Sequence, residues 1–360
     1  MSRFAFIVHP IDAHDVARLG GKYKFVRYLP EPVVEFGLKL KQPSVVSKVE
    51  GVRSKSGAVT DGWFIGLPLV PKQIIDPDSL EEVYAKIVRC TEIAGELGAD
   101  LIGLGAFTSV VGDGGITIRQ RSPIPVTTGN SYTVATAIEG TLKAAAMLDI
   151  DLASATLAVV GATGSIGKTC ARVLSRSFGK TILVGRDQAR TQLVADEIPG
   201  AIATTDINRI READALVTVS SAGAEIIRPE HLKPGAIVCD VARPRDVSVR
   251  VSKERKDVLV IEGGVVRVPG DVEFNFDFGF PEKTAYACMS ETMMLALEGD
   301  PSLFDFTLGK DVSVEQVDTI NRLADKHGFE LAGFRSFERA VDQAAIDRAR
   351  EARNNHRKAA

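Results

Sequence analysis

The chain has 360 residues, of which 45% are hydrophobic and 25% charged, and its formal net charge is −3. This length and composition predict a soluble globular protein of two or more domains, and the charge excludes the basic excess of a nucleic-acid-binding protein. Residues 1–9 are too short an apolar run for a signal peptide, and no stretch approaches the length of a membrane span, so we expect a cytoplasmic location.

The first 148 residues predict an α/β region that precedes any nucleotide motif. A strand is expected at 4–8, a helix after 77–79, a second strand at 101–104 and a long helix at 131–148. We interpret residues 1–148 as a substrate domain.

From residue 156 onward, apolar strands alternate with helices. The strands are expected at 156–160, 181–184, 215–219, 236–239 and 258–261. Such alternation predicts an α/β domain with a Rossmann-type doubly wound parallel sheet, here over residues 149–272.

The first of these strands ends in the sequence Gly-Ala-Thr-Gly-Ser-Ile-Gly at 161–167 and leads into a helix. Glycines in this position let the backbone approach a pyrophosphate at the helix N-terminus, which predicts a dinucleotide site. Two later turns, each after a strand, are expected to contact the same cofactor. The predicted cofactor-binding residues of these turns are Gly161, Thr163, Gly164, Ser165, Ile166, Gly167, Ser220, Ser221, Gly263 and Gly264.

The second strand is followed by arginine where an NAD enzyme usually carries an acidic residue. Arg186, with Arg190, suits the 2′-phosphate of NADPH. The loop of a P-loop NTPase requires a glycine five positions before Gly167, where Ala162 stands, so we reject that alternative. No tyrosine is followed four residues later by lysine, as a short-chain dehydrogenase would require.

The region after residue 272 is expected to contain mostly helices. Helices are predicted at 282–298 and 313–327, and the fold prediction has residues 273–335 packing back over the cleft between the domains. Four phenylalanines alternate within 274–280, so a strand there would present them on one face, as an acyl tunnel or as core. The charged tail, 336–360, is expected to be a solvated helix without an assigned function.

The four cysteines lie far apart and lack metal-site spacing, so neither a disulfide framework nor a structural metal is predicted. Cys288 follows the nucleotide region and could hold an acyl group as a thioester, which a hydride reduces to an aldehyde. The alternative is a small buried apolar residue in a helix.

The chain resembles the cyanobacterial long-chain acyl-[acyl-carrier-protein] reductases, which make fatty aldehydes, over nearly all of residues 3–333. The resemblance implies that acyl carrier protein delivers a fatty acyl thioester, Cys288 takes the acyl group, and NADPH reduces it. It also implies a response to Mg²⁺ and transfer of aldehyde to an aldehyde-deformylating oxygenase. The matching stretches are 99–109, 127–130, 158–164, 263–266, 287–288 and 327–329.

Further site residues follow from this interpretation. His9 has a matching histidine in the family, and Thr108, Ser109 and Asn130 could donate hydrogen bonds to the thioester carbonyl. An acidic carrier protein also predicts a basic surface, for which Lys22, Lys24, Arg27, Lys39 and Lys41 are available. The alternatives are an NADP dehydrogenase of the shikimate or methylene-tetrahydrofolate type, and a non-catalytic protein that binds NADPH and an acyl chain.

Overall fold

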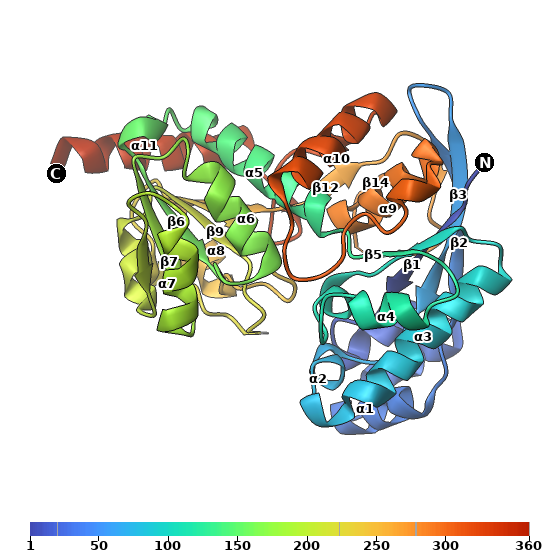
Figure 1. Cartoon of the computed structure of the whole chain (residues 1–360). Helices are drawn as coiled ribbons and strands as arrows, with labels where there is room; N and C mark the ends of the chain where they lie inside the picture. The colour runs from blue at the N-terminus through green and yellow to red at the C-terminus, as the bar shows by residue number, and fades with distance from the viewer. Residues whose placement is uncertain (20, 223, 278, 360) are drawn as a thin grey trace. The chain divides into compact units, whose positions relative to one another are not determined.

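A computed structural model describes all residues except 20, 223, 278 and 360, and omits the side chains of 18, 19, 21, 22 and 359. The chain divides into two compact units (Figure 1). Unit 1 comprises Met1–Tyr132, Val266–Lys310 and Asp318–Glu330, and unit 2 comprises Thr133–Val265, Asp311–Val317 and Leu331–Ala360.

Unit 1 is built on a six-stranded mixed sheet in the order β13-β2-β3-β1-β4-β5. Strands β3, β1, β4 and β5 are parallel, whereas β2 is antiparallel to β3 and β13 is antiparallel to β2. The strands are β1 (Phe4–Val8), β2 (Ser44–Arg53), β3 (Val59–Gly66), β4 (Leu101–Gly103), β5 (Val126–Thr127) and β13 (Gly270–Glu273).

Both faces of this sheet are covered, because side chains alternate along each strand. Ala5 and Ile7 pack in a hydrophobic cluster with Ile87 of α3 (Leu80–Glu96). Helix α9 (Ala287–Glu298) packs against β1, β3 and β4. A Cβ on Gly103 would lie 2.1 Å from the Thr292 Oγ1, so glycine permits this close packing. The other α-helices with residues in unit 1 are α1 (Glu31–Leu40), α2 (Pro71–Ile74), α4 (Ile116–Arg121), the start of α5 (Asn130–Met147) and part of α10 (Val314–His327).

Unit 2 contains a six-stranded, wholly parallel sheet in the order β11-β10-β9-β6-β7-β8. The strand order reverses next to β6, as in a doubly wound dinucleotide-binding domain, which confirms the predicted fold class. The strands are β6 (Thr156–Val160), β7 (Lys180–Val184), β8 (Ile202–Thr204), β9 (Ala215–Thr218), β10 (Ile237–Asp240) and β11 (Leu259–Glu262), and the helices are α5 (Asn130–Met147), α6 (Ser165–Leu174), α7 (Gln188–Asp196), α8 (Val249–Glu254) and α11 (Gln343–Ala359).

Two smaller sheets are also present. A three-stranded sheet has the order β14-β12-β15, and a two-stranded sheet pairs β16 with β17. Their strands are β12 (Val265–Arg267), β14 (Thr284–Tyr286), β15 (Glu330–Leu331), β16 (Arg335–Ser336) and β17 (Arg339–Ala340). No helix of the described residues combines the length and apolar character that a membrane crossing requires.

The helix predicted at 282–298 starts later than expected. Lys283 has a left-handed φ of 57°, Thr284–Tyr286 form strand β14, and the helix begins only at Ala287. Strand pairing therefore overrides the helix propensity of these residues, and Cys288 is the second residue of α9 instead of a residue in mid-helix.

The prediction of one phenylalanine-lined strand at 274–280 is wrong. Strand β13 ends at Glu273, and Asn275 has a φ of 51°. Phe274 stacks on the core residue Phe64 at 5.9 Å and Phe276 meets the same ring edge-on at 6.3 Å, so both half-buried rings pack on the core. Phe280 packs on Tyr286, and Phe278 lies outside the described residues.

The tail helix is present but is not fully solvated. In α11, Ile346 and Ala349 are buried, and the buried Arg353 pairs with Asp214 at 2.6 Å. A Cβ on Gly235 would lie 2.3 Å from the Arg353 Cβ, so the helix packs directly on that turn. One face of the tail is thus docked on unit 2.

Candidate functional site

The glycine-rich turn of unit 2 lies at the carboxyl end of β6. Gly161 has a φ of 81°, and a Cβ there would lie 2.8 Å from the Val219 carbonyl oxygen. A Cβ on Gly167 would lie 2.3 Å from the Gly161 carbonyl oxygen, so only glycine lets α6 approach β6 this closely. The same turn and the start of α6 carry Thr163, Gly164, Ser165 and Ile166. The glycines therefore bring the N-terminus of α6 up to the end of β6, the arrangement at which dinucleotide-binding domains hold a phosphate.

The two arginines predicted to select NADPH follow β7. Arg186 directly follows Gly185, and Arg190 lies in α7, which the Asp187 side chain caps by accepting the Arg190 N–H at 3.0 Å. Both side chains are exposed, and neither makes an ion pair within the described part of the chain. Their guanidinium groups are free to meet a 2′-phosphate beside β7.

Asp246, which sequence reasoning missed, holds the turn after β9. The Ser220 N–H and hydroxyl donate to its carboxylate at 2.8 and 2.6 Å, and the Thr218 hydroxyl donates at 2.5 Å. Burial raises the pKa of Asp246, opposed by these hydrogen bonds. Ser220 is thus fixed next to β6, whereas Ser221 is exposed.

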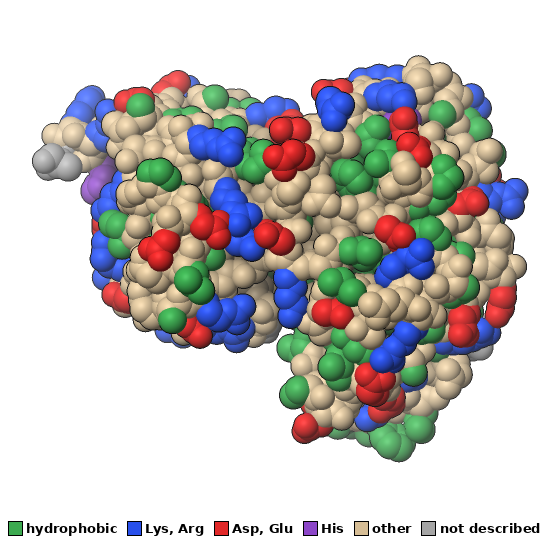
Figure 2. Space-filling model, in the orientation of Figure 1, with side chains coloured by type: hydrophobic (Ala, Val, Ile, Leu, Met, Phe, Trp, Pro, Cys, Tyr) green, Lys and Arg blue, Asp and Glu red, His purple; other side chains and the backbone are tan. Residues whose placement is uncertain are grey.

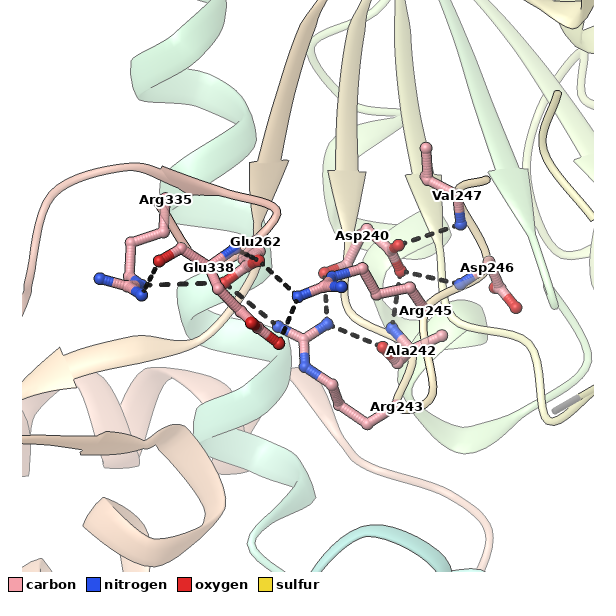
Figure 3. Close-up of polar contacts among 9 residues, drawn as sticks. All are labelled: Asp240, Ala242, Arg243, Arg245, Asp246, Val247, Glu262, Arg335 and Glu338. Carbon is pink, nitrogen blue, oxygen red and sulfur yellow. Dashed lines mark hydrogen bonds and ion pairs between the residues drawn. The ribbon is translucent and has the colours of Figure 1, made fainter. Parts of the chain in front are cut away.

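A charged cluster lies at the carboxyl ends of β10 and β11 (Figure 3). The buried Glu262 carboxylate pairs with Arg245 at 3.2 Å and lies within 4 Å of Arg243 and Arg335. Glu338, between β16 and β17, pairs with Arg245 at 3.0 Å. The cluster joins the β16–β17 hairpin to this edge of the sheet.

The glycines that follow Glu262 are buried. A Cβ on Gly263 would lie 2.8 Å from a Val241 methyl group and 3.1 Å from the Cys239 sulfur, and Gly264 has a φ of 87°. Close packing in unit 2 therefore accounts for glycine at position 263.

Replacing Asp240 with asparagine should flatten the pH dependence of stability. Burial raises the pKa of Asp240 to about 6, opposed by Arg243 and by the Val247 N–H, while Asp246 adds to the rise. As pH rises from about 4 to about 6, Asp240 loses its proton in the unfolded chain but keeps it in the folded protein. The free energy of unfolding should therefore fall by on the order of 2–3 kcal/mol over this range. Between pH 4 and pH 7, the unfolding free energy of Asp240→Asn should therefore rise by that amount relative to wild type, as measured by urea unfolding. If the difference in unfolding free energy between variant and wild type does not change with pH, this titration of Asp240 is excluded.

In unit 1, Cys288 lies at the N-terminus of α9, where the helix dipole favours a thiolate. A Cβ on Gly129 would lie 2.4 Å from both the Cα and the Cβ of Cys288, so the loop after β5 touches the cysteine backbone. Burial raises the pKa of the half-buried thiol and Glu291 adds to the rise, whereas the backbone groups of Met289 and Ala106 lower it. The thiol is therefore protonated at neutral pH and requires a base.

Two buried polar atoms at the ends of the parallel strands have no hydrogen-bond partner within the described chain. One can accept a proton and the other can donate a hydrogen bond. The His9 Nε2, after β1, is one, and its Nδ1 lies 3.0 Å from the Pro10 carbonyl oxygen, which places the proton on Nδ1. Burial lowers the pKa of His9, so Nε2 is a neutral base. The Thr128 Oγ1, after β5, is the other.

The remaining predicted residues of this set are engaged locally. The Thr108 hydroxyl donates to the Gly105 carbonyl at 2.8 Å, and the Ser109 hydroxyl donates to the Ala106 carbonyl at 2.7 Å. Asn130 is buried as the first residue of α5. Of these three hydroxyls, that of Thr128 is therefore the best candidate to donate a hydrogen bond to a substrate carbonyl.

Glu291, one turn after Cys288, was also missed by sequence reasoning. It is fully buried, and its carboxylate accepts from the Thr127, Ser131 and Thr307 hydroxyls and from the Tyr132 N–H at 2.6–3.0 Å. The sequence offered only one sign of this role, a single acidic residue within the apolar part of a helix. Glu291 fastens the loop after β5 to the helix that carries the cysteine.

Among the described residues, no group of three or more His, Cys, Asp or Glu side chains could hold a metal ion. The Mg²⁺ that the resemblance implies has no support from this geometry. The cations considered for a carrier protein are mostly exposed: Lys24, Arg27 and Lys39 face solvent, Lys41 donates to the Tyr23 hydroxyl, and the Lys22 side chain lies outside the described residues.

Comparison with known proteins yields a family match and distant relatives. Residues 143–262 match the shikimate/quinate 5-dehydrogenase family. The chain is 29% identical over 303 residues to aminotransferase PigE of Serratia sp., covering 82% of this chain and 35% of PigE, so it spans about a third of that relative. It is also 29% identical over 304 residues to the long-chain acyl-[acyl-carrier-protein] reductase of Synechococcus elongatus, covering 80% of this chain and 87% of the reductase.

Among solved structures, glutamyl-tRNA reductase from Methanopyrus kandleri matches with a TM-score of 0.30 and 20% identity, covering 53% of this chain and 50% of that chain. The family match lies in the parallel-sheet unit. Together with the strand order, it supports an NAD(P)-dependent oxidoreductase.

Proposed function

We propose that the protein reduces a long-chain fatty acyl thioester to a fatty aldehyde with NADPH, and that Cys288 carries the acyl group. The proposed donor is an acyl carrier protein, with coenzyme A as the alternative. The observation that carries this proposal is the placement of Cys288 at a helix N-terminus against Gly129. A relative of similar length, named as an acyl-[acyl-carrier-protein] reductase, supports it.

In the proposed first step, the Cys288 sulfur attacks the thioester carbonyl carbon. The new carbon–sulfur bond forms as the bond to the donor's sulfur breaks, and the His9 Nε2 takes the thiol proton and passes it to the departing thiolate. The Thr128 hydroxyl and the N-terminus of α9 stabilise the carbonyl oxygen as it gains negative charge.

The residues of unit 2 fit a dinucleotide phosphate group. Because Gly161 and Gly167 carry no Cβ, α6 begins directly at the end of β6, and the first N–H groups of this helix have no carbonyl partner within it; Arg186 and Arg190 suit the 2′-phosphate. When bound, NADPH supplies the hydride that reduces the acyl carbon to the aldehyde. Cys288 is then the leaving group, as a thiolate that the helix N-terminus stabilises.

Intact mass spectrometry tests this proposal. The protein mixed with a long-chain acyl-carrier-protein thioester, without NADPH, should gain one acyl group that maps to Cys288. Addition of NADPH should remove the adduct as aldehyde appears. Cys288→Ala should form no adduct, whereas Cys90→Ala, at the buried cysteine of α3, should behave like wild type. Lack of any adduct from carrier or coenzyme A donors would refute the proposal.

Arg186→Ala should raise the KM for NADPH about tenfold to a hundredfold and leave the KM for NADH within about twofold, because a charged contact to phosphate is worth about 1.5–3 kcal/mol. Arg211→Ala, which removes an exposed charge from the segment before β9, is the matched control. Equal loss with both cofactors would show that Arg186 does not bind the 2′-phosphate. Steady-state kinetics with each cofactor provide the measurement.

The family match over residues 143–262 favours one alternative, an NADP dehydrogenase that acts on a small polar substrate. Such an enzyme would not need the Cys288 thiol. The mass experiment separates the two functions, because this dehydrogenase would form no acyl adduct and would keep its activity in the Cys288→Ala variant.

A further inference from the structure

Helix α1 of unit 1 is apolar on two faces, of which only one is used by the fold. Val34 and Leu38 face inward and pack in a cluster with Val16, Val26 and Val70. The opposite face is exposed and also apolar: Val33, Phe36 and Leu40 recur at the i, i+3 and i+7 spacing of one helix face and are 54%, 66% and 68% exposed.

The 3-10 helix before α1, Gly21–Tyr28, adds Phe25 and Tyr28, which are 58% and 74% exposed. Among the described residues, Phe25, Tyr28 and Phe36 are the three exposed aromatic side chains. Figure 2 shows hydrophobic side chains gathered at the lower end of this unit, where Figure 1 places α1. We call these five residues, Phe25, Tyr28, Val33, Phe36 and Leu40, the α1 surface. Clustered exposed apolar side chains of this kind indicate a binding surface.

The segment that carries the α1 surface contains more basic than acidic residues. Residues 21–41 contain five basic and two acidic residues, a formal charge of +3 in a chain of net charge −3. Lys24 and Arg27 are exposed, and Lys39 is exposed and paired with Glu82 at 3.2 Å. Glu35 is buried and paired with Lys72 at 2.7 Å. Glu31 is the exposed acid of this segment.

We propose that the α1 surface docks the protein on an anionic lipid bilayer. An apolar helix face bordered by lysine and arginine is the chemistry that binds a bilayer surface: the apolar side chains enter between the lipids while the cations meet the phosphates. A bilayer requires no matching pocket, and both the convex helix face and the adjacent cations fit it. This placement goes beyond the proposed reaction and does not depend on it.

Vesicle sedimentation of the full chain tests this inference without using activity. The protein should pellet with vesicles of phosphatidylglycerol and phosphatidylcholine, and bind at least about tenfold more weakly to phosphatidylcholine alone or at high salt. Phe36→Glu and Leu40→Glu should each reduce binding to the anionic vesicles at least about tenfold. Leu193→Glu, at an equally exposed leucine of α7 in unit 2, should bind like wild type. Thermal unfolding should be unchanged in all three variants, because the side chains are exposed.

Three outcomes would overturn the inference. Wild type that stays in the supernatant with anionic vesicles excludes bilayer docking. A wild-type dimer that Leu40→Glu dissociates, in sedimentation without lipid, shows that a second copy covers the surface. Binding to acyl carrier protein that Leu40→Glu abolishes, without vesicle binding, assigns the surface to that acidic protein. Because the vesicle experiment does not measure turnover, its failure would not contradict the proposed acyl-cysteine reaction.

Discussion

Gly129→Ala should destabilise the protein by about 3 kcal/mol and slow acylation of Cys288 about a hundredfold, although every reactive group remains. The added methyl group would lie 2.4 Å from the Cys288 Cα and Cβ and 2.8 Å from its carbonyl oxygen, so loop or helix must move. The left-handed φ of 73° adds a conformational cost of about 1–2 kcal/mol, and overpacking adds about 1–3 kcal/mol. A displacement of about 1 Å at a reacting group lowers a rate about a hundredfold.

Gly200→Ala is the matched control for this variant. Gly200 has the same φ of 73°, but a Cβ there would meet nothing within 4 Å, so only the conformational cost should appear. Urea unfolding and the yield of acyl adduct measure the two effects. Equal destabilisation of both variants, with a normal adduct from Gly129→Ala, would show that the contact with Cys288 does not matter.

Glu291→Leu should destabilise the protein by about 3–5 kcal/mol, because three hydroxyls and one N–H lose a buried acceptor. Glu291→Gln keeps one acceptor oxygen but aims an amide N–H at donors, so an intermediate loss is expected. In both variants the loop from Thr127 to Tyr132 should be released from α9.

Glu139→Leu is the control for the Glu291 variants, because that glutamate is only partly buried and, among the described residues, pairs with Lys143 across one helical turn. Its unfolding free energy should change by no more than about 0.5 kcal/mol. Hydrogen exchange should report faster exchange at 127–132 in the Glu291 variants alone. Protection there as strong as in wild type would mean that the loop does not depend on this carboxylate.

The parallel sheet of unit 2 could be predicted closely because its strands are continuous apolar runs between turn residues. The strand predicted at 156–160 agrees with β6, and the other four predicted strands agree within one residue at each end. The short strand β8 was missed, because its three residues are only half-buried and lack an apolar run.

The candidate site in unit 1 could be predicted only in part, because its contacts join residues far apart in the chain. Cys288 was predicted from its position after the nucleotide region and His9 from the family resemblance, but the sequence did not indicate that Gly129 touches the cysteine. Glu291 is bonded to residues about 160 positions away, a relation without local signal. The packing of one face of α11 could not be predicted for the same reason. In the sequence, Arg353 is typical of a solvated charge, and its partner Asp214 lies 139 residues away.

Each of the two units is assembled from three separate stretches, and the chain passes between them five times, after residues 132, 265, 310, 317 and 330. An exchange of nucleotide-binding domains between homologues would therefore need several junctions, each cutting through contacts that hold a unit together. A single proteolytic nick, by contrast, should leave fragments that stay associated and cannot be purified apart without denaturant. Substitutions at single positions, such as Arg186 or Leu40, are therefore the practical way to alter one property of this protein at a time.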